Sequence, residues 1–183
     1  MKSKRPDQHK QLIALSEISL SLDTYDDIFS DFDPRPYSQR ALSDDFLAEA
    51  RKAVRNKPSG AIELRFVIPA HARNTQYETT IRERLRRYFS DQHRHVRSAL
   101  KATRDKSLLL TLLGICLMFA AAYIRSLPVE TLQLQLLFVL FEPAGWFCAW
   151  YGLDRLVTLW TTSKPELEFY HKMSRCEIAF ASY

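Results

Sequence analysis

The chain has 183 residues, of which 26% are charged and 46% are hydrophobic, and its formal net charge is +5 at pH 7. This length leaves room for one compact soluble domain and a short membrane segment, and it excludes several large domains within this chain. Residues 1–100 are rich in Arg, Asp and Ser, whereas residues 101–150 are dominated by apolar residues.

Three short segments alternate between apolar and polar residues, which is the period of a half-buried β-strand. They are residues 17–22, 61–68 and 175–181. We expect them to share one sheet, and because alternation suits a sheet with one solvated face, we expect that sheet to be antiparallel or mixed. Before the first strand, residues 1–11 are polar, and residues 1–15 are predicted to form a flexible tail.

Residues 23–37 form an acidic segment in which carboxylates are interleaved with aromatic side chains. The carboxylates could bind a divalent cation, because hard cations prefer several carboxylate oxygens, although the spacing does not match an EF-hand. The aromatic residues could instead anchor a protein partner, or the segment could be a connection whose aspartates cap local turns. The candidate metal ligands are Asp23, Asp26, Asp27, Asp31 and Asp33, and the candidate partner-binding residues are Tyr25, Phe29, Phe32, Asp33 and Tyr37.

One helix is predicted between the first two strands. Ser43 is a suitable N-cap, and Asp44 follows it in the first turn, where negative charge favours the helix dipole. Apolar residues then recur at helical spacing from Phe46 to Val54, so one face of this helix can pack on the sheet. Together these elements predict a cytoplasmic α+β domain over residues 16–74.

A longer helix is predicted from Thr75, because apolar residues recur every three or four positions and no Gly or Pro occurs before Gly114. Its first part, residues 75–106, is expected to be a basic helical stalk. The helix continues into residues 107–125, an apolar run long enough to cross the roughly 30 Å hydrocarbon core of a bilayer. A second apolar run, residues 132–153, follows after a short connection, so the two runs predict a transmembrane hairpin.

Basic residues are concentrated directly before the first span, between residues 82 and 106. Because Lys and Arg near span ends are retained in the cytoplasm, we expect a protein of the plasma (inner) membrane with both termini cytoplasmic. Residues 154–183 are then a cytoplasmic helix and strand that complete the sheet. The same cations suit anionic lipid headgroups, whereas no motif that reads RNA or DNA accompanies them, so nucleic acid is a disfavoured partner. The cations expected at lipid headgroups are Arg94, Arg97, Lys101, Arg104 and Lys106.

Glu142 and Pro143 interrupt the second span near its middle. An ionisable residue at this depth is costly unless it is neutral, paired or facing water, and it is a functional-site hypothesis by default. Glu142 could be a proton-sensitive switch, a polar contact between protomers, or a structural group hydrogen-bonded within the hairpin to Tyr123 or Thr111. Pro143 leaves the carbonyl one turn earlier without its donor, so we expect a kink. Small residues that would allow another helix to approach follow in the same span: Ala144, Gly145, Ala149 and Gly152.

The chain resembles a group of small, uncharacterised prokaryotic membrane proteins with two spans. The resemblance is carried by the segments YDDIFSDFDPRPYSQRALSDDFL, FEPAGWF and FYHKMSRCEIAF. It implies the topology already inferred from the residues, and it implies no activity or site. The predicted fold is α+β, a small three-stranded sheet with one packed helix, plus a two-helix transmembrane hairpin on a long helical stalk.

The sequence contains none of the common enzyme motifs, such as GxSxG, HExxH, the P-loop or GxGxxG. An enzymatic function is therefore disfavoured, no catalytic residue is assigned and no cofactor is expected. The predicted function is that of a membrane-anchored interaction or scaffold protein that self-associates in the lipid bilayer. The alternative is an oligomeric channel or membrane-permeabilising effector that uses Glu142.

Overall fold

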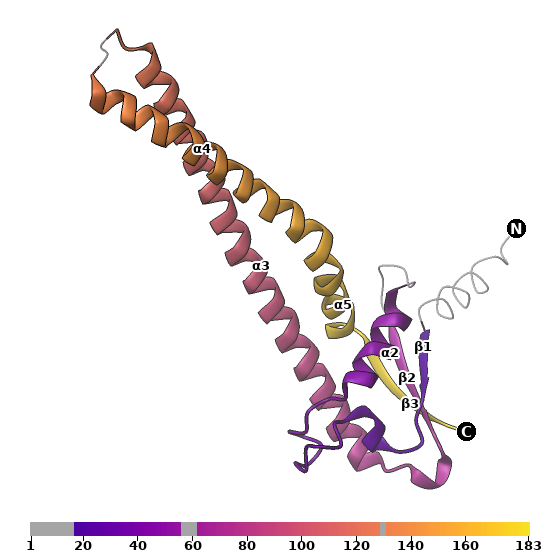
Figure 1. The fold of residues 1–183 in the computed structure, drawn as a ribbon. Helices are drawn as coiled ribbons and strands as arrows, with labels where there is room; N and C mark the ends of the chain where they lie inside the picture. Colours follow the sequence, from indigo (N-terminus) through magenta and orange to yellow (C-terminus); the bar gives the residue numbers. More distant parts are fainter. Residues whose placement is uncertain (1–16, 56–61, 129–130) are drawn as a thin grey trace, which may run out of the picture. The chain divides into compact units, whose positions relative to one another are not determined.

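The computed structural model describes residues 17–55, 62–128 and 131–183. Two compact units, Met1–Arg94 with Leu167–Tyr183 and His95–Glu166, are considered separately. The strands are β1 (Glu17–Ser21), β2 (Glu63–Ile68) and β3 (Glu177–Ser182). The helices are η1 (Tyr25–Ile28), α2 (Asp44–Arg55), η2 (Ala70–Ala72), α3 (Thr75–Ser126), α4 (Leu132–Thr158), η3 (Leu159–Ser163) and α5 (Lys164–Ser174) (Figure 1).

The protein is mostly helical and has one small sheet, in agreement with the predicted α+β class. The predicted strands and the helix before β2 lie within two residues of β1, β2, β3 and α2. The predicted tail at residues 1–15 lies outside the described residues, as do residues 56–61 between α2 and β2.

The sheet is parallel throughout, in the order β1-β2-β3. The antiparallel or mixed sheet expected from the alternating residues is therefore wrong. Helices connect every pair of consecutive strands, α2 between β1 and β2 and α3 to α5 between β2 and β3, as parallel pairing requires. Crossover connections between parallel strands are right-handed. When each new strand is added on the same side of the previous one, as in the order β1-β2-β3, the connecting helices therefore lie on one face of the sheet. The other face stays open, and this gives a parallel sheet the alternation typical of antiparallel ones.

The covered face of this sheet is the core of the unit that contains the strands. Leu64, Phe66 and Ile68 of β2 are completely buried, and the strand register places Ile18 and Ile178 beside Leu64. The one helix that was predicted to pack on the sheet is α2, but η1, α5 and the beginning of α3 also bury apolar residues in this core. The completely buried side chains of these four helices include Ile28, Ala50, Ile81, Leu85, Phe89 and Met173.

The second unit is built mainly from α3 and α4. The prediction of one uninterrupted helix from Thr75 is confirmed, because α3 continues for 52 residues to Ser126. In α4, the helix continues through Pro143 to Thr158. A π-helical segment, η3, then joins α4 to α5.

Candidate functional site

Glycine residues form the contact between α3 and α4. A Cβ atom placed on Gly114 would lie 2.3 Å from the backbone nitrogen of Ala149, and one placed on Gly152 would lie 2.8 Å from the carbonyl oxygen of Ser107. Gly145 is buried against the same helix, where a Cβ atom would lie 3.0 Å from the Gly114 carbonyl oxygen. The backbones can approach this closely only because these positions have no side chain. The predicted close approach of small residues therefore occurs within the hairpin.

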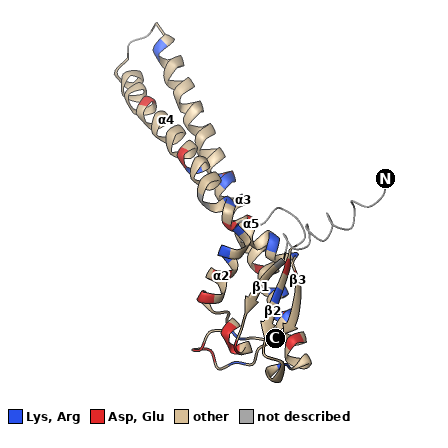
Figure 2. Ribbon diagram, turned by 90° about the vertical axis from the view of Figure 1, so that its right-hand side faces the viewer, with Lys and Arg blue, Asp and Glu red and all other residues tan. Residues whose placement is uncertain are grey.

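Many large apolar side chains of the same two helices face away from this contact. Leu109, Phe119, Val139 and Phe147 are each between 66% and 73% exposed. In the most apolar stretch of each helix, 17% of α3 and 11% of the helix that begins at Leu132 is buried, whereas the core helix of a soluble protein is mostly buried. Figure 2 shows few charged residues along these stretches, and the one acidic residue within the apolar run of α4 is Glu142. Both helices are therefore long and apolar enough to cross a membrane.

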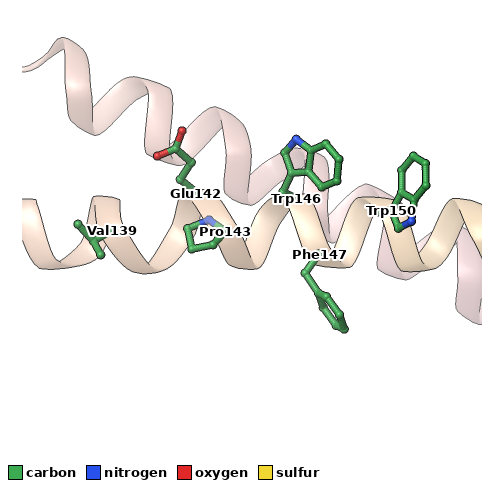
Figure 3. Close-up of a pocket in the computed structure, with 6 residues that line it drawn as sticks. All are labelled: Val139, Glu142, Pro143, Trp146, Phe147 and Trp150. Atoms are coloured by element: carbon green, nitrogen blue, oxygen red, sulfur yellow. The ribbon is translucent and has the colours of Figure 1, made fainter.

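Glu142 lies on the exposed surface of α4. It borders a groove of about 670 Å³ whose other lining residues are Val139, Pro143, Trp146, Phe147 and Trp150. In Figure 3, Glu142, Trp146 and Trp150 project from one side of the helix, while Phe147 projects from another. The rings of Trp146 and Trp150 are stacked, with centroids 5.7 Å apart. The groove is thus mostly apolar, and its one ionisable group is the Glu142 carboxyl group.

The Glu142 carboxyl group makes no hydrogen bond or ion pair with the residues that the structure describes. The two partners expected within the hairpin are engaged elsewhere or exposed. The Thr111 hydroxyl donates a hydrogen bond to the Ser107 carbonyl at 2.9 Å, and Tyr123 is 67% exposed. Pro143 is also exposed, and it has no N–H to donate to the Val139 carbonyl. The Glu142 carboxyl group therefore lies unsatisfied beside the groove, and the Val139 carbonyl lacks the donor that the residue one turn later supplies in an ordinary helix.

No protein family, curated protein or solved structure matches this chain. The function is therefore inferred from the residues of this chain alone.

The aromatic residues of the acidic segment do not share one surface. Tyr25 and Phe29 are buried in the core, 5% and 2% exposed, and the Tyr37 ring stacks on Phe29 with centroids 5.2 Å apart. Phe32 is 98% exposed, so it is the only large aromatic side chain of this segment that is fully accessible to a partner. The buried pair was assigned to partner binding because sequence spacing does not reveal which side of a loop faces the core.

Three carboxylates of the same segment hold its turns together. Asp27 accepts hydrogen bonds from the backbone N–H of Asp23 at 2.8 Å and of Thr24 at 3.0 Å. Asp33 accepts hydrogen bonds from the Arg35 guanidinium and from the backbone N–H of Ala41, and these hold the pKa of the Asp33 carboxyl well below its usual range.

Asp26 pairs with Arg40 and accepts a hydrogen bond from the Tyr37 hydroxyl, while Asp31 is exposed. Within the described part of the chain, no three Asp, Glu, His or Cys side chains are arranged to hold a metal ion. The contacts favour the turn-capping interpretation of this segment.

The five basic residues expected at lipid headgroups are all exposed on α3. Arg94 pairs with Asp91, and Arg104 pairs with Asp105 at 2.9 Å. Arg97, Lys101 and Lys106 make no ion pair within the described residues. These cations are available to an anionic surface.

A buried polar network was not predicted from the sequence. The Glu78 carboxylate, 5% exposed, accepts hydrogen bonds from the Arg73 guanidinium at 2.8 and 3.0 Å and from the Tyr25 hydroxyl at 3.1 Å. The Tyr25 hydroxyl accepts a hydrogen bond from the Asn74 backbone N–H at 2.9 Å. The Arg73 hydrogen bonds lower the pKa of Glu78, and burial raises the pKa of Tyr25. Every member is satisfied, so the network joins η1 to the beginning of α3.

Proposed function

We propose that this chain is a two-span protein of the plasma (inner) membrane and that both termini are cytoplasmic. Its α+β unit is a non-enzymatic interaction or scaffold domain held at the membrane by the α3–α4 hairpin. The exposure of the apolar side chains on both helices, around an interface made of glycine residues, is the observation that carries this proposal. Exposure of this apolar surface to water is unfavourable, whereas its contact with lipid chains carries no such cost.

The distribution of charge supports the orientation. Exposed cations lie on α3 immediately before the apolar stretch, and five of them reach from Arg94 to Lys106. Each Lys or Arg near an anionic membrane surface contributes about 1 kcal/mol of attraction. On the far side of the first span, Arg125 is the only cation before the second span begins.

Reporter fusions test this topology. We expect a green fluorescent protein fused after Tyr183 to fluoresce, and an alkaline phosphatase fused after Ser126 to be active. Replacing Lys101, Arg104 and Lys106 by Gln should lower phosphatase activity, because fewer cations retain the N-terminal side in the cytoplasm. Replacing the remote Lys52 and Arg55 by Gln is the control and should change neither signal. An active phosphatase after Tyr183 would refute the orientation.

The interaction surface proposed for the cytoplasmic unit is centred on Phe32. Its side chain is 98% exposed, and the loop that carries it is held by the hydrogen bonds of Asp33 and by the Asp26–Arg40 pair. A rigid loop with an exposed aromatic residue loses little entropy when it binds a partner.

A photoreactive amino acid at position 32 tests this surface in cells. We expect one adduct that is absent when the same group replaces Gln39, an exposed residue of the same loop. Phe32→Ala should abolish binding of the partner so identified and change the free energy of unfolding by less than about 0.5 kcal/mol. Equal adducts from both positions would remove Phe32 from the proposal.

A second candidate function is an oligomeric channel or membrane-permeabilising effector. The outward position of Glu142 on α4 favours it, because several copies could then direct this carboxyl group toward a shared axis. Purified protein in liposomes should then conduct ions, and Glu142→Gln should abolish the flux. Oligomers that leave the liposomes impermeable would eliminate this candidate.

A further inference from the structure

We infer that one face of α4 binds the same face of a second copy of this chain. This face, named here the carboxyl face, consists of Val139, Glu142, Trp146 and Trp150, which recur every three or four residues along the helix. The inference rests on the proposed membrane topology, and it adds the surface and the contacts through which two copies associate.

Lipid alone would leave the polar groups of the carboxyl face unsatisfied. Glu142 lies ten residues after Leu132, so it is about 15 Å from that end of the span and near the middle of the hydrocarbon core. The Trp146 indole N–H makes no hydrogen bond within the described residues, and the Val139 carbonyl has lost its helical donor to Pro143. Each such group is unfavourable in hydrocarbon, where no water can bind it.

The hairpin itself does not satisfy these groups. The side of α4 that contacts α3 is occupied by Gly145, Ala149 and Gly152, and α3 presents Gly114 and Thr111 there. Glu142 and Trp146 are both exposed on the surface. Because none of the described residues satisfies them, we place their partner outside the protomer.

A second copy offers hydrogen-bonding groups that match those of the first. Two copies inserted with the same orientation pair about an axis along the membrane normal, so each residue meets its counterpart at the same depth. Val139 of the other copy then lies about 4.5 Å from Glu142 along the helix axis on one side, and Trp146 about 6 Å on the other. A neutral Glu142 can donate its O–H to that Val139 carbonyl and accept the N–H of that Trp146. Twofold symmetry repeats both hydrogen bonds.

The shape of the carboxyl face also fits a second copy. The stacked Trp146 and Trp150 rings border the groove of about 670 Å³ on one side and a second groove of about 260 Å³, beside α3, on the other. A ridge of two aromatic rings between two grooves is self-complementary, because the ridge of one copy can enter a groove of the other. Packing between helices is the main source of association in lipid, where the hydrophobic effect between them is absent.

The oligomeric state of the full-length protein in lipid nanodiscs or vesicles tests this inference. Dimer dissociation is measured by energy transfer between labelled copies over a range of protein-to-lipid ratios. We expect Glu142→Leu to raise the dissociation constant about 10- to 100-fold, since four interhelical hydrogen bonds are lost, two from each copy. Glu142→Gln keeps a donor and an acceptor and should stay within about threefold of the wild type. Trp146→Phe should weaken the dimer, whereas the matched control Trp160→Phe should not.

A photoreactive group at Val139 should form an adduct with a second copy, and the same group at Leu112 of α3, which is 59% exposed, should not. A wild type that is monomeric at all ratios, or a Glu142→Leu variant that dimerises normally, would overturn the inference. An adduct only with another protein, or larger oligomers that conduct ions, would also overturn it. Resistance to alkaline carbonate extraction is measured on every variant. A monomer that resists extraction contradicts only the dimer, whereas a wild type that is extracted contradicts the membrane proposal itself.

Discussion

Replacing Gly114 by Ala tests the close packing of α3 against α4. The new Cβ atom would lie 2.3 Å from the Ala149 nitrogen, 2.6 Å from the Gly145 carbonyl oxygen and 2.8 Å from the Ala149 Cα. All three neighbours are backbone atoms, so no side chain can rotate away. Since ordinary contacts begin at 3.4 Å, the two helices must separate by about 1 Å.

The size of the effect follows from two opposing contributions. Overpacking of this kind costs about 1–3 kcal/mol, and a gap of about 1 Å forfeits up to half of the dispersion energy along the contact. Alanine in a helix interior is favoured over glycine by about 1 kcal/mol. We therefore expect Gly114→Ala to lower the free energy of unfolding of the hairpin by about 1–2 kcal/mol.

Gly145→Ala is the matched control. There the nearest atom is the Met118 Cγ at 2.8 Å, which belongs to a flexible side chain, and the nearest backbone atoms lie at 3.0 Å. The smaller clash and the gain in helix propensity should cancel to within about 0.5 kcal/mol. Both variants are measured by denaturant titration in mixed micelles, followed by tryptophan fluorescence. A Gly114→Ala protein as stable as the wild type, or a Gly145→Ala protein that is the less stable of the two, would refute the packing argument.

Two further predictions concern the unit that contains the sheet. Because Arg73 lowers the pKa of Glu78, the stability that this pair contributes is present above the ordinary value of 4.5 and is lost as the pH falls through the folded value. Urea titrations of the full chain should show a larger loss of unfolding free energy between pH 6 and pH 3 in the wild type than in Glu78→Gln, and equal losses would contradict this role. Burial raises the pKa of the Cys176 thiol to about 11, so maleimide at pH 8 should modify it only after addition of denaturant, as read by mass spectrometry of the labelled peptides. Rapid labelling of Cys176 in the folded protein would show that its thiol is accessible.

The positions of the elements could be predicted from the sequence, but the direction of the strands could not. Alternation locates a strand because it reports which side chains face the core, and β2 shows this pattern in full. It carries no information on strand direction. In this protein the connections determine direction, and the 52-residue α3 returns through α4 and α5 to the same sheet. Parallel pairing at β3 depends on that long excursion.

The candidate site residues also differ in how far the sequence alone reveals them. Glu142 could be selected from the sequence because a carboxylate within an apolar helix is rare, but only the helix packing shows that it faces outward. Glu78 gave no signal, because an acidic residue in the first turn of a helix is usually a solvated group that favours the dipole. Its burial depends on Tyr25 and Arg73, which adjoin it only in the folded unit.

Because β3 follows α3 and α4 in the chain, the sheet can be completed only after both helices have been synthesised. β2 is the central strand, and the ribosome synthesises α3 and α4 after β2 and before β3. Until β3 emerges, one edge of β2 presents unpaired N–H and C=O groups to chaperones and proteases. On the proposed topology, both spans reach the insertion machinery before this edge can be covered. On that topology, a complete sheet therefore forms only after both spans have been synthesised, and a nascent chain stalled before β3 carries an open strand edge.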